Sequence, residues 1–191
     1  MSINEIRRIV TGQDAHGKAV FTEVGPLPTV VPLATIPGTV FHEILSRQQT
    51  LASVGNLLDS TLGPLVLSPS RHGTLIRIVD IPPDTEEFLQ HGSQDARCVR
   101  ADWRGRGVDG ASGVAASLMH RTESIDYDVV LERALTLVLD DSETKLRPGD
   151  VVVQRGTNHA GANRSGAPCR MLFVRVDGQY DAALVQAQAD R

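Results

Sequence analysis

The chain has 191 residues and a formal net charge of −4, with 19 Lys and Arg against 23 Asp and Glu. That balance argues against a dedicated nucleic-acid-binding protein, which usually presents a basic excess to the phosphates. The apolar runs are far shorter than the roughly 20 residues of a transmembrane helix, and 17 Gly and 10 Pro are too densely spaced for coiled coils or helical bundles.

The cysteines indicate the cellular compartment, and the chain length indicates the number of domains. Cys98 and Cys169 are far apart and have no metal-like spacing, so no disulfide framework is predicted. The first ten residues lack the charged and then apolar pattern of a signal peptide. We therefore expect a cytoplasmic protein with a single domain over residues 1–191.

Short β-type segments separated by turn residues occupy the N-terminal part of the chain. The predicted elements are strands at 6–11, 18–24, 39–45 and 74–79, with a short helix or a loop at 51–58. The polar stretch 13–17 ends in Gly17 and is typical of a hairpin loop between the first two strands. Prolines then interrupt regular structure, at Pro26, Pro28, Pro32 and Pro37.

The C-terminal part is more regularly punctuated. Residues 92–113 contain five glycines among balanced Arg and Asp residues, which indicates a mobile loop near the mouth of a site. Beyond it, turn signals recur about every 8–12 residues, a spacing typical of β-sandwiches and barrels. The predicted elements are strands at 114–121, 127–131, 135–139, 144–147, 151–154 and 170–176, and a helix within 179–189.

Two segments of this part resemble the paired motifs of the cupin superfamily. The matching residues are His120 and Asp126 in the first motif, and Gly149, Gly156, His159 and Asn163 in the second. Asp126 takes the place of the usual glutamate, Thr122 stands where the second histidine belongs, and Arg133 replaces a glycine. The stretches HRTESIDY and RRIVTGQDAHGKAVF are also similar to a bacterial and fungal branch of small, uncharacterised RmlC-like cupins.

This resemblance implies an all-β fold, the double-stranded β-helix or jelly-roll barrel of the cupins. The barrel is expected over residues 75–177, with 1–74 as an N-terminal strand extension and 178–191 as a C-terminal tail. Because small cupins commonly pair, the resemblance also implies a homodimer.

The alternation of strand side chains places the candidate metal ligands. His120 and Thr122 point to the same side, into the barrel if Arg121 faces out. His159 follows a strand and a turn, and is placed to meet His120 across the lumen. Two imidazoles and one carboxylate can hold Fe, Mn, Ni or Zn. We therefore predict a divalent metal on His120, Asp126 and His159, with Thr122 bonded to a metal-bound water.

Other interpretations of these residues stay open. The two histidines could bind a ligand without metal or be purely structural, and Asp126 could face solvent beside Asp128 or orient a histidine. Tyr127 could be a packed aromatic, or it could place its hydroxyl at the lumen for proton transfer. Gln154 ends a strand near the site, so it is a candidate to line a polar pocket. Thr122, Tyr127 and Gln154 are thus the predicted substrate-binding residues.

Two further positions depart from expectation for a cupin. Glycine at position 133 would permit a positive φ, so with Arg133 we expect a changed turn or an interface role. Gly161 stands where an aromatic is expected, which would leave space beside His159. The remaining histidines are predicted to lie at the surface, at His16, His42, His72 and His91.

Two main classes of function follow, and a third, metal-free acid–base chemistry of the epimerase type, would pair one histidine with Tyr127. The first is a metal-dependent enzyme acting on a small organic molecule, of the dioxygenase, isomerase or decarboxylase type. The second is a binding module that takes a small molecule in the same pocket with neither metal nor catalysis. No phosphate-binding loop, dinucleotide fingerprint or nucleophile elbow is present, so no organic cofactor is expected.

Overall fold

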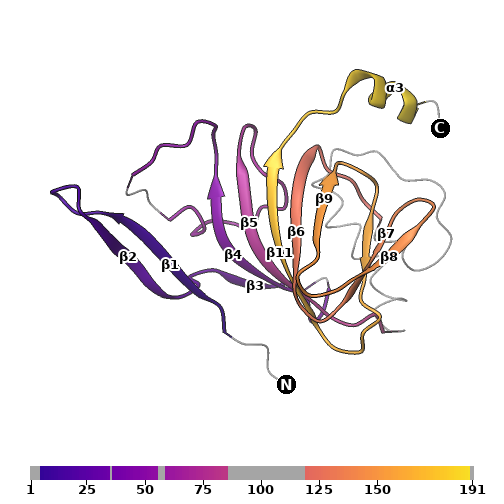
Figure 1. Ribbon diagram of the computed structural model, residues 1–191, viewed down its shortest axis with the longest axis horizontal. Helices are drawn as coiled ribbons and strands as arrows, with labels where there is room; N and C mark the ends of the chain where they lie inside the picture. The colour runs from indigo at the N-terminus through magenta and orange to yellow at the C-terminus, as the bar shows by residue number, and fades with distance from the viewer. Residues whose placement is uncertain (1–4, 35, 56–58, 86–118, 190–191) are drawn as a thin grey trace.

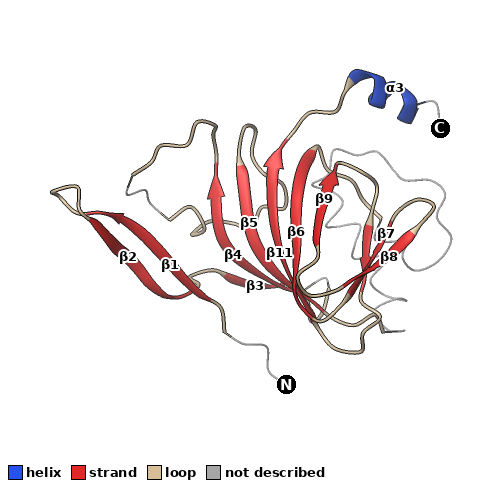
Figure 2. Cartoon of the chain, in the orientation of Figure 1, coloured by secondary structure: helices blue, strands red, loops and turns tan. Residues whose placement is uncertain are grey.

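The computed structural model describes residues 5–34, 36–55, 59–85 and 119–189, and the chain is almost entirely β-structure within them (Figures 1 and 2). The elements are β1 Arg7–Gln13, β2 Ala19–Pro26, β3 Val30–Pro32, β4 Val40–Arg47, β5 Thr74–Ile81, β6 Ser124–Glu132, β7 Leu135–Val138, β8 Glu143–Leu146, β9 Val151–Arg155, β10 Ala160–Ala162, β11 Cys169–Asp177 and α3 Ala182–Ala189. The predicted all-β class is confirmed, as is the short C-terminal helix.

Two antiparallel sheets form the barrel. The larger has the strand order β3-β4-β5-β11-β6-β9, and the smaller has the order β10-β7-β8. Alternation along the strands divides their side chains between interior and exterior. In β6, for example, Asp126, Asp128 and Val130 are buried whereas Ile125 and Tyr127 are exposed. An apolar core fills one part of the interior, formed by Val130, Leu135, Leu146, Cys169 and Met171.

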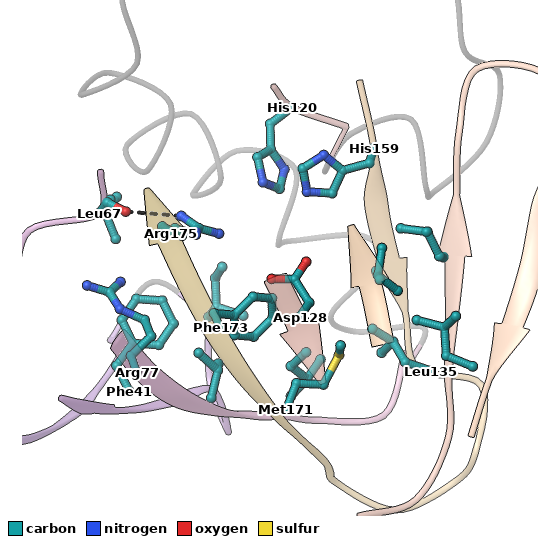
Figure 3. A pocket seen from close by; sticks show the side chains of 17 residues that line it. Phe41, Leu67, Arg77, His120, Asp128, Leu135, His159, Met171, Phe173 and Arg175 are labelled. Carbon is teal, nitrogen blue, oxygen red and sulfur yellow. Dashed lines mark hydrogen bonds between the residues drawn. The ribbon is translucent and has the colours of Figure 1, made fainter. Parts of the chain in front are cut away.

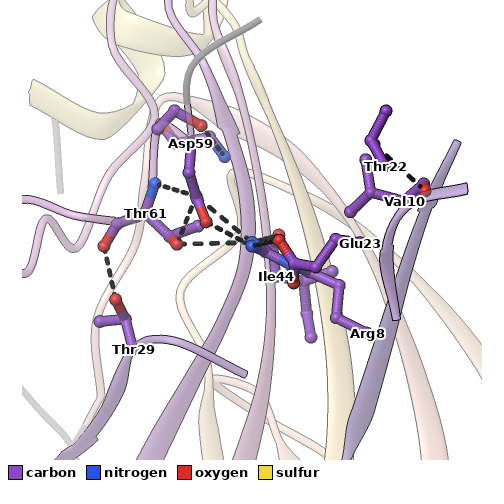
Figure 4. A network of polar contacts seen from close by, with 10 residues as sticks. Arg8, Val10, Thr22, Glu23, Thr29, Ile44, Asp59 and Thr61 are labelled. Carbon is purple, nitrogen blue, oxygen red and sulfur yellow. Dashed lines mark hydrogen bonds and ion pairs between the residues drawn. The ribbon is translucent and has the colours of Figure 1, made fainter. Parts of the chain in front are cut away.

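The predicted N-terminal hairpin is confirmed, and it projects from the barrel as a separate two-stranded sheet (Figure 1). An isolated hairpin is marginally stable in water, so contacts with the rest of the chain matter. Arg8 supplies them (Figure 4): its guanidinium donates to Glu23 at 2.7 and 2.8 Å, to the Ile44 carbonyl at 3.2 Å, and to Asp59. Both carboxylates raise the pKa of Arg8 further, which keeps this anchor charged.

Several local predictions differ from the structure. Strands β3 and β10 were not predicted, because three-residue strands carry no usable periodicity. Residues 51–55 adopt the loop that was one of the two expectations for 51–58, whereas residues 119–121 form no strand beyond an isolated bridge at His120. The predicted loop at 92–113 and most of the strand at 114–121 lie outside the described residues, as does His91.

Two single residues also correct the sequence-based expectations. Arg133 has a φ of 69°, so the turn after β6 keeps the left-handed backbone that a glycine would adopt, and the expected change of shape is wrong. His42 was predicted at the surface, but it is half-buried on β4. Its Nε2 lies 2.8 Å from Asp80, which also accepts a hydrogen bond from Arg170 at 2.7 Å. No helix in the described ranges is long and apolar enough to cross a membrane.

Candidate functional site

A backbone bridge brings the two predicted histidines together. The amide of His120 donates to the carbonyl of His159, and the amide of His159 donates to the carbonyl of His120, both at 2.9 Å. The centroids of the two imidazole rings are consequently 4.4 Å apart, with the rings tilted by 50°. The proximity that the sequence predicts for these residues is therefore present in the fold.

The two rings lie at one end of a cavity of about 230 Å³ between the sheets (Figure 3). Most of its wall is apolar, formed by Ile36, Phe41, Leu67, Val79, Ile81, Leu135, Leu137, Leu146, Val152, Gly161, Met171 and Phe173. Its polar residues are His120, His159, Asp128, Arg77 and Arg175. An apolar cavity with a few convergent polar groups is the usual form of a small-molecule site.

The orientation and charge of His159 are set by its neighbours. Its Nδ1 lies 2.9 Å from the carbonyl oxygen of Thr157. Because a carbonyl only accepts, Nδ1 carries the proton, and Nε2 of the neutral ring keeps its lone pair. Burial lowers the pKa of His159, although the bond to Thr157 opposes this. His159 is therefore a neutral imidazole near pH 7, with Nε2 available as a base or ligand.

Gln154 contacts Thr157, the residue whose carbonyl oxygen accepts the hydrogen bond of His159. Its side-chain amide donates to the carbonyl oxygen of Thr157 at 3.3 Å and to the Thr157 hydroxyl. Gln154 is buried but does not belong to the pocket wall. Gln154 therefore acts indirectly on the site. It positions Thr157 and, through Thr157, the ring of His159.

Asp126 is buried and already engaged on both oxygens. The Ser124 hydroxyl lies 2.6 Å from Oδ1 of Asp126 and 2.7 Å from Oγ1 of Thr122. A chain of hydrogen bonds thus links Thr122, Ser124 and the Asp126 carboxylate. On the other side, Oδ2 lies 3.4 Å from Nε of Arg175. Neither Asp126 nor Thr122 lines the pocket.

These contacts bear on the predicted metal site. Within the part of the chain that the structure describes, no three His, Cys, Asp or Glu side chains are arranged to hold a metal ion. Asp126 does not join the two imidazoles, because Ser124 and Arg175 take up its carboxylate. The predicted ligand set of His120, Asp126 and His159 therefore does not fit as a three-residue metal centre.

The structure also separates Tyr127 from the site. Tyr127 lies between Asp126 and Asp128 on β6, so its side chain points to the opposite face of the sheet, where it is 44% exposed. The predicted lumen position of its hydroxyl is not observed. Gly161, in contrast, lines the pocket as expected, and a Cβ there would approach Leu135 Cδ2 to 2.9 Å.

Asp128 is a site residue that sequence reasoning missed. Figure 3 shows its carboxylate in the pocket, pointing toward the two imidazoles. Its register partners on the neighbouring strands are Phe173 and Val152, so it is flanked by apolar side chains. Burial, and secondarily the charge of Asp126, raise its pKa to about 7, although Arg175 opposes the shift. Alternation from Asp126 would have placed it inside.

Two arginines of the site were also missed, because their partners are distant in sequence. Arg77 on β5 is 2% exposed and lies over the ring of Phe41 at 4.8 Å. Arg175 on β11 donates to the Leu67 carbonyl at 3.0 Å and lies 5.6 Å from the centroid of the Phe173 ring. Only the pairing of β4, β5, β11 and β6 brings these side chains to one wall.

Comparison with known proteins gives several relatives. The chain is 33% identical over 184 residues to the phomopsin biosynthesis cluster protein D of Diaporthe leptostromiformis, covering 90% of this chain and 78% of that protein. It is 40% identical over 179 residues to a cupin-domain-containing oxidoreductase of Neurospora crassa, covering 92% and 76%. No protein-family profile matches the chain.

Solved structures also resemble the fold. A cupin 2 conserved barrel domain protein from Salinispora arenicola aligns with 84% of this chain and 95% of its own length, at 17% identity and a TM-score of 0.37.

Proposed function

Since the chain belongs to the cupin superfamily, we propose that it is an enzyme that converts a small organic molecule in the pocket between its two sheets. The observation that carries this proposal is that one apolar cavity holds a neutral imidazole, His159, and a carboxyl group, Asp128, whose buried Oδ1 has no hydrogen-bond partner among the described residues. Groups whose environments shift their pKa values in this way are typical of acid–base sites.

The proposed chemistry is proton transfer. Nε2 of His159 accepts a proton from a carbon next to a carbonyl group, and protonated Asp128 donates its proton to the carbonyl oxygen, which gives an enol. Returning a proton to a different carbon, or to the other face, completes an isomerisation that needs no oxidant or reductant. A pKa of about 7 lets Asp128 hold and release a proton near neutral pH.

A metal-dependent reaction is the second candidate. The bond from Nδ1 of His159 to the Thr157 carbonyl supports it, since metal-binding histidines commonly donate their other ring nitrogen in this way. A divalent Fe, Mn, Ni or Zn ion on the two imidazoles would supply Lewis-acid chemistry. The contacts of Asp126 with Ser124 and Arg175 count against the third predicted ligand.

An exchange experiment separates these candidates. The purified chain would be incubated in D₂O with a panel of small ketones, among them acetophenone, and α-deuteration followed by NMR. We expect catalysed exchange that survives treatment with EDTA, and a loss of about a hundredfold or more in His159→Ala and in Asp128→Asn, the usual scale of acid–base catalysis. Circular dichroism would confirm folding, and the exposed substitution Asp141→Asn would serve as control.

The metal content of the same preparations gives the other outcomes. Stoichiometric metal that is lost in both His120→Ala and His159→Ala, together with exchange that EDTA abolishes, would favour the metal-dependent enzyme. Ligand binding with neither exchange nor metal would favour the binding module without catalysis.

We also propose that the chain forms homodimers. Two apolar surfaces support this: the projecting hairpin exposes Ile9, Phe21 and Val24, and the outer face of the larger sheet exposes Ile125 and Val151. Contiguous exposed apolar residues commonly mark protein–protein interfaces.

A further inference from the structure

We infer that the pocket takes an uncharged molecule, about the size of a substituted single ring, that carries a carbonyl or hydroxyl oxygen. This inference rests on the proposed function, because it names the substrate class of the same site. It follows from the partners of each charged group on the pocket wall, and these partners are set by strand register.

The first charge, on Arg77, is balanced by Glu43. The two residues are register partners on β5 and β4, and Nε of Arg77 lies 3.2 Å from Oε1 of Glu43. Burial lowers the pKa of Arg77 to about 10 and raises that of Glu43, but each partner opposes the shift of the other. Arg77 is held further by its hydrogen bond to the Val66 carbonyl.

The second charge, on Arg175, is balanced in the same way by Asp126. These residues are register partners on β11 and β6, with Nε and Oδ2 separated by 3.4 Å. The guanidinium is held further by its bond to the Leu67 carbonyl. Both arginines of the wall are thus committed to carboxylates of the protein itself.

Asp128 has no such partner. Two residues further along β6, its neighbours in register are Phe173 and Val152, neither of which carries a charge. Its Oδ1 is buried without a hydrogen-bond partner among the described residues. A buried polar atom in this state is costly unless a ligand or water satisfies it. A ligand hydroxyl would donate a hydrogen bond to this carboxyl group, and a ligand carbonyl oxygen would accept one from its OH when Asp128 is protonated.

These pairings decide between ligand charges. With Arg77 paired with Glu43 and Arg175 paired with Asp126, neither described arginine of the wall offers an unpaired cation to a ligand. A carboxylate ligand would lose its hydration in an apolar cavity without gaining an unpaired cation, which is strongly unfavourable. An uncharged ligand avoids this penalty and gains the contact with the apolar wall.

The volume of the pocket limits the size of the ligand. An engineered apolar cavity of about 150 Å³ binds benzene. The cavity of about 230 Å³ is larger by roughly the volume of a substituent or two, and its apolar side is formed by Leu135, Leu137 and Met171. A single ring with a short substituent therefore fills it.

Acetophenone and benzoate form a matched pair of probes, since they share the ring and differ mainly in charge. Their binding would be measured by calorimetry at about pH 6, below the pKa of about 7 of Asp128. We expect acetophenone to bind at least about tenfold more tightly than benzoate, a difference of about 1.4 kcal/mol or more. Asp126→Asn removes the carboxylate that pairs with Arg175, and Glu43→Gln removes the one that pairs with Arg77. Each variant should therefore bind benzoate about tenfold more tightly and bind acetophenone with nearly unchanged affinity.

Two controls complete the design. Asp141→Asn, which removes an exposed carboxylate, should change neither affinity. Leu137→Trp fills the cavity and should abolish the binding of both probes. Three results would each overturn the inference: equal affinity of the natural chain for the two probes, no acetophenone binding, or no gain in benzoate affinity in both Asp126→Asn and Glu43→Gln. If acetophenone still binds the Leu137→Trp variant, the pocket is not the ligand site and the proposed function fails as well.

Discussion

Asp128 is a carboxyl group whose surroundings favour its neutral form. Burial raises its pKa from 3.8 to about 7, so the folded chain binds this proton more tightly than the unfolded chain does. The sign follows from linkage: its stabilising contribution is complete below about pH 4 and is lost as the pH rises to about 7. Replacing Asp128 by Asn, which has a similar shape but does not ionise, should therefore remove this pH dependence of the free energy of unfolding.

The corresponding prediction concerns Asp128→Asn. The free energy of unfolding of the natural chain, relative to that of the variant, should fall by about 1 kcal/mol per pH unit between about pH 4 and 7. Urea unfolding at a series of pH values would measure it. Asp141→Asn should give a flat difference over the same range, and a flat difference for Asp128→Asn would show that folding does not raise the pKa of Asp128.

At the scale of elements, the turn between β6 and β7 has an unfavourable residue at its centre. Arg133 is exposed and has a φ of 69°, a conformation that disfavours every residue with a Cβ. We predict that Arg133→Gly increases the free energy of unfolding by about 0.5–1 kcal/mol, after allowance for the greater freedom of glycine in the unfolded chain. Arg133→Ala is the control, because it removes the guanidinium but keeps the strain. An equal gain in both variants would instead implicate the charge.

At the scale of the whole molecule, the exposed apolar surfaces lead to a prediction about assembly. Phe21 on the hairpin is 71% exposed and Ile125 on the larger sheet is 41% exposed. In light scattering after size exclusion, the natural chain should have the mass of a dimer, and Phe21→Lys combined with Ile125→Lys should shift it to a monomer. Val54→Lys, at a loop position that is 93% exposed, should have no effect. A monomeric natural chain would contradict the proposed homodimer.

The candidate site shows where sequence reasoning succeeds and where it ends. The resemblance of the segments around His120 and His159 to the paired cupin motifs led to the prediction that the two rings meet, and the structure brings them together. For Asp126, ligation of a metal, exposure to solvent and orientation of a histidine were all open from the sequence, and the structure buries it beside Ser124 and Arg175. Whether a buried carboxylate binds metal or an arginine depends on Arg175, which lies 49 positions later and pairs only through strand register.

The sequence by itself determined the all-β class, the hairpin, the position of most strands and the meeting of two histidines. These features depend on turn residues and on alternation, which act over a few neighbouring residues. Only the tertiary structure decided that Glu43 pairs with Arg77, that Asp126 pairs with Arg175, and that Oδ1 of Asp128 has no hydrogen-bond partner among the described residues. The reason is physical: shifting one strand by a single residue turns every side chain to the other face, and register is set by the packing of the whole barrel.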